Sequence, residues 1–521
     1  MGARSERILY WSAACAALAL RVLAFLRYRF DSDEQQHLHV TWGWTAGLIP
    51  YRDLFDNHSP LFHLITAPLL ALLGERADIL LWMRAPMLVL FAFVLWGTFV
   101  LARDLYDSRV AAWSVLLLAL FPPFFLKSLE YRPDNLWNAL WIAVLLLLLR
   151  ALGTFWIGLL LGCALAVSVK TVLLVIALVT AGALWWFFLP RNRRCDRLSG
   201  KAGLAILGFA VIPAAVAIFF LNAGAWNELL YCNFGFNAHL AQARTYLWIL
   251  RATFPFTLAA LVWMVWRTRG TAHPRRWFIA VTMGMFTITL AGFWPLISPR
   301  DFLPMMPPAA IFAAAALVRM RRPLLAIGAI MALFLASIYY YAGRFEKHTD
   351  WHITMMNQAL RLTRPGESLM DYKGETIYRR RPFYYALEIV TRSQMAAGII
   401  PDTIAQDVIR TRTYAAQADG PMWPPAGRAF LLANFVNLGR LRAAGQWLQP
   451  DGTFTIAIPG PYVVLDERGL APGNLNGTPN DRARHLEAGT HRFTGAPGAC
   501  VVWAPAFERG HSPFHLRDLE F

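Results

Sequence analysis

Residues 61–73 read Leu-Phe-His-Leu-Ile-Thr-Ala-Pro-Leu-Leu-Ala-Leu-Leu, an apolar stretch of 13 residues with Pro68 inside it. A helix that crosses a bilayer needs about 20 apolar residues, and stretches of about 10–14 rarely span. The short length and the proline therefore predict a re-entrant or interfacial helix. Whether this stretch crosses the membrane fixes the side on which every later segment lies.

The chain around this stretch is too apolar for a soluble protein. Of its 521 residues, 57% are hydrophobic and 16% are charged, and the mean hydropathy is +0.42. Arg4 and Arg7 precede the first apolar run without a small-residue cleavage site, which predicts a retained signal-anchor helix. Apolar runs of about 15–24 residues then recur until Tyr341. The eleven predicted spans are 8–27, 79–102, 108–126, 135–150, 152–169, 171–189, 203–222, 247–266, 277–297, 302–319 and 323–343.

The basic residues test this count of spans. The net charge is +17, and the basic residues cluster at 191–201, 267–276 and 319–322, in short loops between apolar runs. If the N-terminus is cytoplasmic and residues 61–73 do not span, all three clusters face the cytoplasm. A spanning 61–73 segment would move all three outside, against the positive-inside rule. The charge therefore reports orientation in the lipid bilayer, and no nucleic-acid partner is expected.

The same count places the remaining loops together on the outer side, which is expected to be the periplasmic side of a bacterial inner membrane. These loops carry acidic, basic and histidine side chains, which are costly to bring near hydrocarbon and so mark chemistry or transport. A membrane-embedded site would be assembled on this face. The loops are 28–60, 127–134, the residues around Lys170, 223–246, 298–301 and everything after residue 343.

The composition changes after residue 343, which divides the chain into a transmembrane domain (1–343) and a periplasmic soluble domain (344–521). The predicted fold class is mainly α: a polytopic helical bundle of about 11 spans with juxtamembrane helices, followed by an α/β-to-β-rich domain. The soluble domain lacks catalytic spacing and is expected to be a cap or an acceptor-docking module. It is mixed over 344–447 and β-rich over 448–510, with helices expected at 350–362, 382–391 and 403–410 and strands at 429–435, 462–466 and 500–504.

Asp33 and Glu34 follow the first span and are the first candidates for chemistry. A carboxylate there could act as a general base or bind a divalent cation. The alternative is structural, because Asp33 precedes a plausible amphipathic helix, 34–48, and could cap it. The predicted outer location favours the functional interpretation.

Asp56 and His58 lie just before the short apolar stretch, in Asp53-Leu-Phe-Asp56-Asn-His58-Ser-Pro60. His58 could contact a lipid phosphate, or it could ligate a metal together with Asp56. The alternative is an ordinary hydrogen-bonded histidine at the membrane interface. His37 and His39 lack a third ligand at a suitable spacing, so a dedicated zinc site is not predicted.

The short outer loop 130–134 reads Glu-Tyr-Arg-Pro-Asp. Pro133 favours an extended residue before it, and Asp134 then suits the N-cap of the next helix. Arg132 offers a planar fork of donors and is the better phosphate contact.

Lys170 and Arg300 each lie at the outer end of a predicted span. Each could hold an anionic ligand. The alternatives are a snorkelling Lys170 and an interfacial ion pair between Arg300 and Asp301. Asn233, Asn237, His239 and Arg244 lie among aromatic residues in the 223–246 loop, which could form an interfacial belt or stack on a sugar.

Taken together, these motifs resemble those of the C-type integral-membrane glycosyltransferases over residues 8–343. The chain is most similar to the bacterial relatives of the protein O-mannosyltransferases and to the aminoarabinose transferases that modify lipid A, a group like glycosyltransferase family 39. The motifs are Asp33-Glu34 after the first span, Gly47-Leu-Ile-Pro-Tyr-Arg-Asp53, Asp56-Asn-His-Ser-Pro-Leu61, Arg132-Pro-Asp134 and Arg300-Asp-Phe-Leu-Pro-Met-Met-Pro307.

The resemblance implies a donor sugar linked to a polyprenyl phosphate such as undecaprenyl phosphate, and periplasmic transfer with inversion at the anomeric carbon. It implies that Asp33 is the base for the acceptor hydroxyl, with Glu34 beside it, and that Asp134 is the second acidic position. His58, Arg300 and Lys170 match positions expected at the lipid phosphate. The chain departs from the family at Ser59, which replaces the first residue of a Pro-Pro pair, so the backbone there can differ.

The residue chemistry agrees with this resemblance. A polyprenyl phosphate leaves readily only if its developing charge is neutralised, and the acceptor hydroxyl needs a carboxylate to take its proton. The sequence has no GxxxxGK[ST] and no convincing GxGxxG, so a nucleotide is not expected as a cofactor or direct substrate. A divalent cation is a candidate cofactor. The acceptor could be a glycan, a lipid or a protein.

Two other functions were weighed against a glycosyltransferase. A flippase for polyprenyl-linked sugars or a secondary transporter would place its charges near the middle of the membrane, in inverted repeats with broken helices. Here the charges collect on one predicted face. A structural subunit without activity would not explain acidic residues that cluster with Arg and Lys.

Overall fold

A computed structural model describes residues 3–188, 198–236, 274–294, 297–420, 422–495 and 497–516 of the chain. Contacts divide the chain into two compact units. The helical unit comprises Met1–Arg29, Asn57–Thr66 and Leu81–His348, and the mixed unit comprises Phe30–Asp56, Ala67–Leu80 and Thr349–Phe521. The mixed unit resumes at Thr349, close to the predicted boundary at 343 and 344, but it also takes in two stretches that the sequence had assigned to the transmembrane domain.

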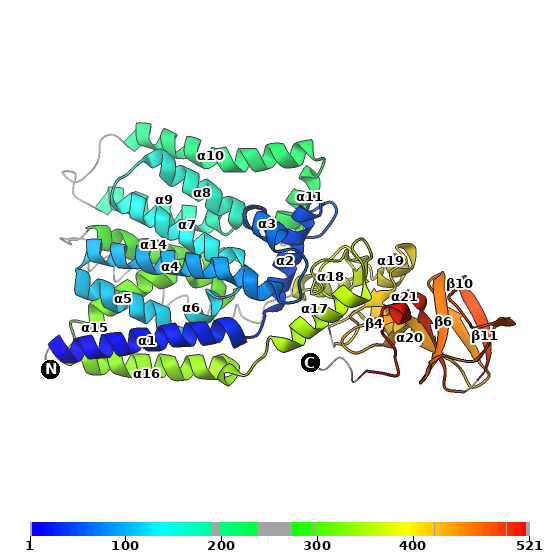
Figure 1. Cartoon of the computed structure of the whole chain (residues 1–521). Coiled ribbons are helices and arrows are strands. Elements are labelled where there is room, and N and C mark those ends of the chain that lie inside the picture. The colour runs from blue at the N-terminus through cyan, green and yellow to red at the C-terminus, as the bar shows by residue number, and fades with distance from the viewer. Residues whose placement is uncertain are drawn as a thin grey trace. The chain divides into compact units, whose positions relative to one another are not determined.

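The helical unit is built from long apolar helices that run side by side (Figure 1). Helix α3 reproduces the predicted 61–73 helix, and the predicted span 247–266 lies outside the described residues. The helices are α1 (Ala3–Arg27), α3 (Leu61–Leu73), α4 (Ile79–Leu105), α5 (Ser108–Leu120), α6 (Pro122–Lys127), α7 (Pro133–Leu149), α8 (Thr154–Val167), α9 (Thr171–Phe188), α10 (Leu198–Asn222), α11 (Trp226–Leu230), the π-helical turn η2 (Tyr231–Gly235), α14 (Pro274–Phe293), the 3-10 helix η3 (Pro299–Met305), α15 (Met306–Leu317), α16 (Pro323–Tyr341) and the short 3-10 helix η4 (Gly343–Phe345); α3 and α4 each contain a boundary between the units.

Five of the described helices are long and apolar enough to cross a membrane: Arg4–Arg27, Ile79–Leu105, Lys201–Asn222, Pro274–Phe293 and Pro323–Tyr341. Shorter apolar helices, among them α5, α7, α8 and α9, accompany them. The chain is therefore a multi-pass membrane protein, while the number of eleven spans stays a prediction.

Helices α8 and α10 pack closely because glycines line their contact. A Cβ atom added at Gly158 or Gly162 of α8 would collide with backbone atoms of α10, and one added at Gly208 of α10 would collide with the backbone of α8. Small residues four apart let membrane helices approach to backbone contact, where dispersion and weak polar contacts hold them. This packing fixes the end of α8 and the turn that carries Lys170.

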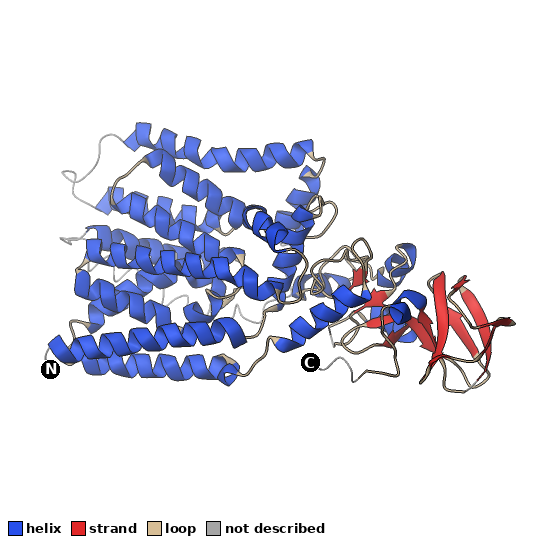
Figure 2. Ribbon diagram, viewed as in Figure 1, coloured by secondary structure: helices blue, strands red, loops and turns tan. Residues whose placement is uncertain are grey.

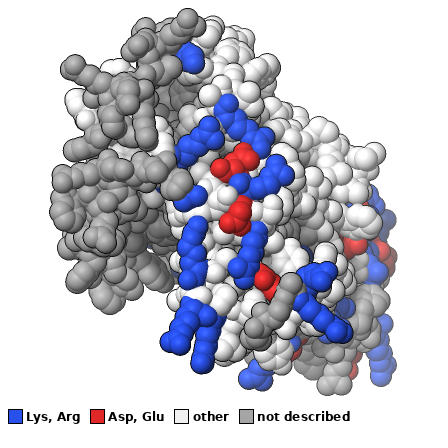
Figure 3. Space-filling model, turned by 90° about the vertical axis from the view of Figure 1, so that its left-hand side faces the viewer, with Lys and Arg blue, Asp and Glu red and all other residues white. Residues whose placement is uncertain are grey.

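One end of the helical unit is strongly basic (Figure 3). Contacts join the predicted cytoplasmic segments there: Arg109 pairs with Glu6 at 2.7 Å, Arg150 pairs with Asp104 at 2.8 Å, and Arg276 donates to the carbonyl of Leu105 at 2.7 Å. These segments were assigned to one side from charge alone. Within the described part of the helical unit they do lie together.

The C-terminal end of α1 is held by a buried arginine from α4. Arg84 donates to the carbonyl oxygens of Tyr28 at 2.9 Å and Arg29 at 2.8 Å. Both carbonyls lie just beyond the last helical residue, Arg27, so these bonds hold the chain where it leaves α1. The point at which the chain leaves α1 is therefore fixed.

The mixed unit combines helices with two β-sheets (Figure 2). One sheet has eight strands in the order β1-β2-β4-β12-β6-β10, with β3 on β4 and β7 on β6, and the other has the order β5-β11-β8-β9. The elements are α2 (Ser32–Thr45), α17 (Asp350–Leu362), β1 (Leu369–Met370), α18 (Ile389–Ala396), α19 (Ile404–Arg410), β2 (Ala415–Ala416), α20 (Pro425–Asn434), β3 (Phe435–Asn437), β4 (Arg442–Trp447), β5 (Thr453–Ile456), β6 (Gly460–Asp466), β7 (Gly469–Leu470), β8 (Gly473–Leu475), β9 (Thr478–Pro479), β10 (Arg484–Leu486), β11 (Gly489–Gly495), β12 (Cys500–Trp503) and α21 (Ala504–Glu508).

Several predictions for this region are confirmed and two are wrong. Helices are found at 350–362 and 404–410, and the strands predicted at 462–466 and 500–504 correspond to β6 and β12. The strand predicted at 429–435 is wrong, because these residues end helix α20, which Pro425 begins in the first helical turn where proline is favoured. The helix predicted at 382–391 is also wrong, since only its last three residues are helical. A short apolar run does not by itself separate strand from helix.

Candidate active site

Helix α2 begins with a capping box that uses Asp31 and Glu34. The Asp31 carboxylate accepts from the backbone N–H of Asp33 at 3.1 Å, and the Glu34 carboxylate accepts from the backbone N–H of Asp31 at 2.9 Å. Such a reciprocal pair satisfies amide groups that the helix leaves without partners. The alternative interpretation of Asp33 as the N-cap is therefore wrong, because the cap lies two residues earlier. Glu34 is fully buried in this cap.

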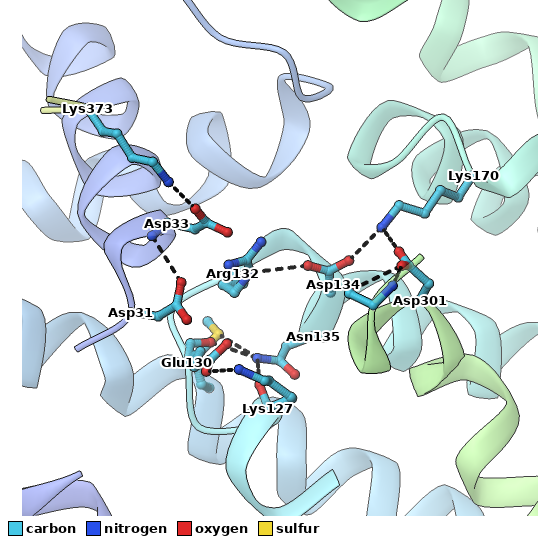
Figure 4. A network of polar contacts seen from close by, with 12 residues as sticks. Asp31, Asp33, Lys127, Glu130, Arg132, Asp134, Asn135, Lys170, Asp301 and Lys373 are labelled. Atoms are coloured by element: carbon cyan, nitrogen blue, oxygen red, sulfur yellow. Dashed lines mark hydrogen bonds and ion pairs between the residues drawn. The ribbon is translucent and has the colours of Figure 1, made fainter. Parts of the chain in front are cut away.

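The side chain of Asp33 instead meets a lysine from the C-terminal part of the mixed unit. Lys373 Nζ lies 2.5 Å from Asp33 Oδ1 and 3.2 Å from Ser32 Oγ (Figure 4). Lys373 was not among the predicted site residues, since it lies 340 residues from Asp33 in a region without catalytic spacing. The only indication in the local sequence was a lysine in the polar turn after β1, and no local pattern predicted that it would contact Asp33.

Residues 49–56 form a constrained loop that ends at Asp56. Asp53 accepts from the backbone N–H of Ile49 at 2.8 Å and pairs with Arg52, which holds the pKa of Asp53 below its usual range. Tyr51 is fully buried with a φ of +70°, an uncommon conformation for a residue with a side chain. Asp56 is also fully buried. The loop thus fixes the backbone that leads to the Asp56–Pro60 motif.

Four charges from three segments of the helical unit form one ion-pair network. Asp134, in the first turn of α7, lies 3.4 Å from Arg132 Nε and 3.2 Å from Lys170 Nζ. Lys170, in the turn between α8 and α9, also pairs with Asp301 of η3 (Figure 4). All four side chains are at most 16% exposed. The structure therefore brings together three residues that the sequence predicted separately.

The position of Asp134 corrects one structural prediction. Arg132 is the N-cap residue of α7, with an extended backbone as expected before proline, and its side chain makes no cap hydrogen bond. Asp134 lies inside the first turn, where a carboxylate is favoured by the helix dipole. Its carboxylate serves the ion pairs and not the predicted N-cap.

The loop before α7 is fixed by a second buried pair. Lys127 Nζ lies 2.6 Å from Glu130 Oε1, and Asn135 Nδ2 donates to the carbonyl of Glu130 at 2.7 Å. Glu130 is fully buried. These contacts hold the short turn that delivers Arg132 to the network.

The described contacts join Asp301 of this motif to the network, through Lys170. Its carboxylate accepts from the backbone N–H of Ser298 at 2.6 Å and the hydroxyl of Ser298 at 3.1 Å, which forms a capping box at the start of η3. Sequence analysis treated Asp301 as a simple partner of Arg300. Arg300 itself is half-buried beside it.

The electrostatics of the network keep Lys170 charged. Burial alone lowers the pKa of Lys170, but the carboxylates of Asp134 and Asp301 outweigh this and raise it. The formal charges of Arg132 and Lys170 balance those of Asp134 and Asp301. His58 lies near enough to act electrostatically on the Asp134 carboxylate.

The network lies at the end of α7 opposite to the basic end. Asp134 is in the first turn of this helix and Arg150 follows its last residue, Leu149. A helix of this length spans about 25 Å, which is close to the hydrocarbon thickness of a bilayer. Within the helical unit, the paired acidic and basic side chains are therefore separated from the basic end by roughly one membrane.

Ser59 and Asn233 place a second loop near the His58 motif. Ser59 Oγ lies 3.4 Å from Asn233 Oδ1, and Asn233 Nδ2 donates to the carbonyl of Leu229 at 3.2 Å. Both side chains are buried. The other candidates of that loop, Asn237, His239 and Arg244, lie outside the described residues.

No set of three or more His, Cys, Asp or Glu side chains suited to a metal ion occurs among the residues that the structure describes. Asp56 belongs to the mixed unit and His58 to the helical unit. The predicted metal contact of these two residues stays a prediction.

Comparison with known proteins agrees with the resemblance drawn from the motifs. Residues 57–219 match the family model described as dolichyl-phosphate-mannose-protein mannosyltransferase. This region contains His58, Arg132, Asp134 and Lys170, but not Asp33 or Arg300. No curated protein sequence matches the chain significantly.

The fold is similar to that of solved membrane proteins. ArnT from Cupriavidus metallidurans bound to undecaprenyl phosphate superposes with a TM-score of 0.57 at 13% identity, over 85% of this chain and 98% of that chain. Its apo structure gives a TM-score of 0.55 at 14% identity over the same shares. The predicted resemblance to C-type membrane glycosyltransferases is thus confirmed for the fold, and by the family model for residues 57–219.

Proposed function

We propose that this protein is a membrane glycosyltransferase that moves a sugar from a polyprenyl phosphate to a hydroxyl acceptor, with inversion at the anomeric carbon. The single observation that carries the proposal is the network of Arg132, Asp134, Lys170 and Asp301, which three separate segments assemble at the end of the helices opposite to the basic end. A lipid-linked phosphate carries its charge at the end of the membrane-crossing helices. Binding it there would explain why ionisable side chains are buried at that point, since burying them without such a role is costly.

The donor phosphate is proposed to bind to His58, Arg132, Lys170 and Arg300. A phosphate that leaves the anomeric carbon gains negative charge, and cations fixed before the reaction stabilise it at no cost of reorganisation. Arg132 is oriented for this role by Asp134 at 3.4 Å. Lys170 is bound to two carboxylates, so its main contribution is to keep the network assembled. The matched family is named for a dolichyl phosphate, and the similar ArnT structure is bound to undecaprenyl phosphate. Both lipids are polyprenyl phosphates, which supports this donor class.

Asp33 is proposed to be the general base that takes the proton of the acceptor hydroxyl. Of the acidic residues at the start of α2, Asp31 and Glu34 form the capping box, whereas the Asp33 side chain lies outside it and is 24% exposed. Glu34 then supports the base by fixing the helix start, and Asp134 acts on the donor side through Arg132. The acceptor is a glycan, a lipid or a protein that carries a hydroxyl group.

The proposal includes no nucleotide and retains a divalent cation as a candidate cofactor at Asp56 and His58. It places the enzyme in a bacterial inner membrane with the C-terminal region in the periplasm. A chelator such as EDTA, followed by addition of Mg²⁺ or Mn²⁺, tests the cation. A reporter fused after Tyr341 tests the topology, and a cytoplasmic signal from it would contradict the location.

The decisive experiment supplies the purified full-length protein with a panel of undecaprenyl phosphate-linked hexoses and pentoses and with acceptor fractions. Release of undecaprenyl phosphate, together with labelling of one fraction by the sugar, is the expected result, and the panel identifies the sugar class. Movement of the labelled lipid across a vesicle without release of the phosphate would instead show a flippase.

A further inference from the structure

The turn that carries Lys373 is built around a buried aspartate. Asp371 Oδ1 accepts from the backbone N–H of Gly374 at 2.8 Å and from Arg381 Nε at 2.8 Å. Its other oxygen accepts from the backbone N–H of Thr376 at 2.8 Å and from the hydroxyl of Thr376 at 2.7 Å. A carboxylate with four donors fixes a turn tightly, because bonds to an ionised group are stronger than neutral ones.

This turn is seated directly on helix α2, within the mixed unit. Gly374 adopts a φ of +98°, and a Cβ added there would lie 2.5 Å from the Cβ of His39. His39 Nδ1 lies 2.7 Å from the carbonyl oxygen of Ile377 on the other side of the turn. Glycine is therefore required at 374 both by its backbone conformation and by the close approach of α2. The seating fixes the position of Lys373 relative to the start of α2.

Lys373 extends from this turn to Asp33 and stays charged there. The lysine side chain is 13% exposed and that of Asp33 is 24% exposed. Burial alone lowers the pKa of Lys373, but attraction to Asp33 first, and then to Glu388 and Glu375, raises it. A buried ammonium held at 2.5 Å from a partly exposed carboxylate is a specific arrangement, since lysine is seldom buried without a partner.

Four other acidic groups near this pair have partners of their own. Asp31 and Glu34 form the capping box of α2. Asp371 is bound by its turn and by Arg381, and Glu375 accepts from the backbone N–H of Lys373 at 2.8 Å. Among the described contacts, the carboxylate that pairs with the Lys373 ammonium is that of Asp33.

We propose that Lys373 is a positioning residue. It holds the Asp33 carboxylate ionised and oriented to take the proton of the acceptor hydroxyl. The inference rests on the proposed function and adds to it a residue from the C-terminal region, which the sequence had assigned only to capping or docking. That region would then take part in acceptor activation through one side chain.

The proton balance of the step is simple. The acceptor O–H gives its proton to Asp33 as the acceptor oxygen bonds to the anomeric carbon, and the bond from that carbon to the phosphate oxygen breaks with its electron pair on the leaving polyprenyl phosphate. Lys373 keeps its proton throughout. An ammonium within about 4–6 Å lowers the pKa of a carboxyl by about 1–3 units, so a base with this neighbour stays ionised at lower pH.

The test compares Lys373→Met with Lys373→Arg in the full-length protein. The probe is the undecaprenyl phosphate-linked sugar of the panel that gives the fastest release of the lipid phosphate. In Lys373→Met the acid limb of kcat/KM is expected to move to higher pH by about 1 unit or more. Lys373→Arg should restore most of the shift, and Lys201→Met, an exposed lysine of α10, should cause none. A fall in rate with an unmoved acid limb would overturn the inference, because a purely structural lysine acts in that way.

A second measurement does not depend on activity. Water-soluble carbodiimides react with protonated carboxyl groups, so the pH at which Asp33 becomes labelled, read by peptide mass spectrometry, reports its titration. Labelling in Lys373→Met should extend to higher pH than in the native protein by about 1 unit or more. Identical labelling curves would also overturn the inference.

The two proposals can fail separately. If Asp33→Asn retains turnover, the base assignment in the proposed function is wrong whatever Lys373 does. If Asp33→Asn abolishes turnover while Lys373→Met leaves both the acid limb and the labelling curve unmoved, the proposed function survives and the role of Lys373 is wrong.

Discussion

Asp33, the predicted base, and Asp134, the predicted second acidic position, have different surroundings in the two units. Asp134 is 8% exposed and lies between two cations, Arg132 and Lys170. Asp33 is 24% exposed and pairs with Lys373. A carboxylate buried between two cations is held as part of the scaffold, whereas a more exposed carboxylate is accessible to the proton of an acceptor. Burial, more than residue type, therefore separates a candidate base from a scaffold residue.

The largest expected effect is on turnover at the exposed carboxylate. Asp33→Asn removes the proposed base and should reduce the rate of sugar transfer by about 10²–10⁴-fold, the usual contribution of general base catalysis. The protein should stay folded and inserted, but the unfolding midpoint in detergent should fall somewhat, because the largely buried Lys373 ammonium loses its carboxylate partner. Asp481→Asn, at an exposed aspartate of the mixed unit, serves as the matched control. Full activity in Asp33→Asn would remove the distinction drawn between the two carboxylates.

At the buried network around Lys170, the main expected effect is a loss of stability. Lys170→Met leaves Asp134 and Asp301 as buried carboxylates that have lost their shared cation, and breaking a buried pair costs about 3–5 kcal/mol. The unfolding midpoint in detergent should fall strongly.

A companion variant separates charge from packing at this position. Lys170→Met combined with Asp134→Asn and Asp301→Asn removes the stranded charges and should recover part of the lost stability. If the single variant unfolds like the native protein, the network is not the scaffold that its burial suggests.

Much of the fold could be predicted from the sequence, because it depends on local patterns. The helix at 61–73 and the helix at 350–362 were predicted with their observed bounds, since apolar periodicity and length are properties of a single segment. The strand predicted at 429–435 failed because its apolar run suits either structure.

The candidate site could be predicted only in part, for a related reason. His58, Arg132, Asp134 and Lys170 could be named as candidates because each lies next to an apolar run, where a charge is conspicuous. Lys373 and Asp301 were missed because their roles arise from pairing over 340 and 131 residues, which no local pattern records. The exact cap of α2 was missed since several acidic residues in a row can each serve.

A moderate effect is expected at the proposed phosphate site. Arg300→Ala removes a charged donor from the donor side, and a hydrogen bond to a charged group contributes about 1.5–3 kcal/mol. The KM for the lipid-linked donor should therefore rise about tenfold or more, while the KM for the acceptor stays nearly constant. Arg482→Ala, at an exposed arginine, should leave both constants unchanged. An equal rise in both KM values would argue against a role in holding the phosphate.

The smallest expected effect concerns the turn that supports Asp33, and it contrasts with the fully paired network. Burial, and then the neighbouring Asp371, raise the pKa of Glu375 to about 7 from an ordinary value of 4.5. Between these two values the folded protein binds a proton that the unfolded chain does not, so stability falls as the pH rises through this window. The loss is complete above about pH 7, and it is absent below about pH 4.5.

Glu375→Gln tests this contrast, because glutamine keeps the acceptor for the Lys373 backbone N–H but carries no charge. Between pH 5 and pH 8, the unfolding midpoint of this variant should depend less on pH than that of the native protein. Glu487→Gln, at a glutamate that is 79% exposed, should show the same pH dependence as the native protein. Equal slopes in all three proteins would mean that Glu375 ionises normally. The charges of the turn that carries Lys373 would then be as well balanced as those of the network around Lys170. Solvent exposure alone would then distinguish Asp33 from Asp134.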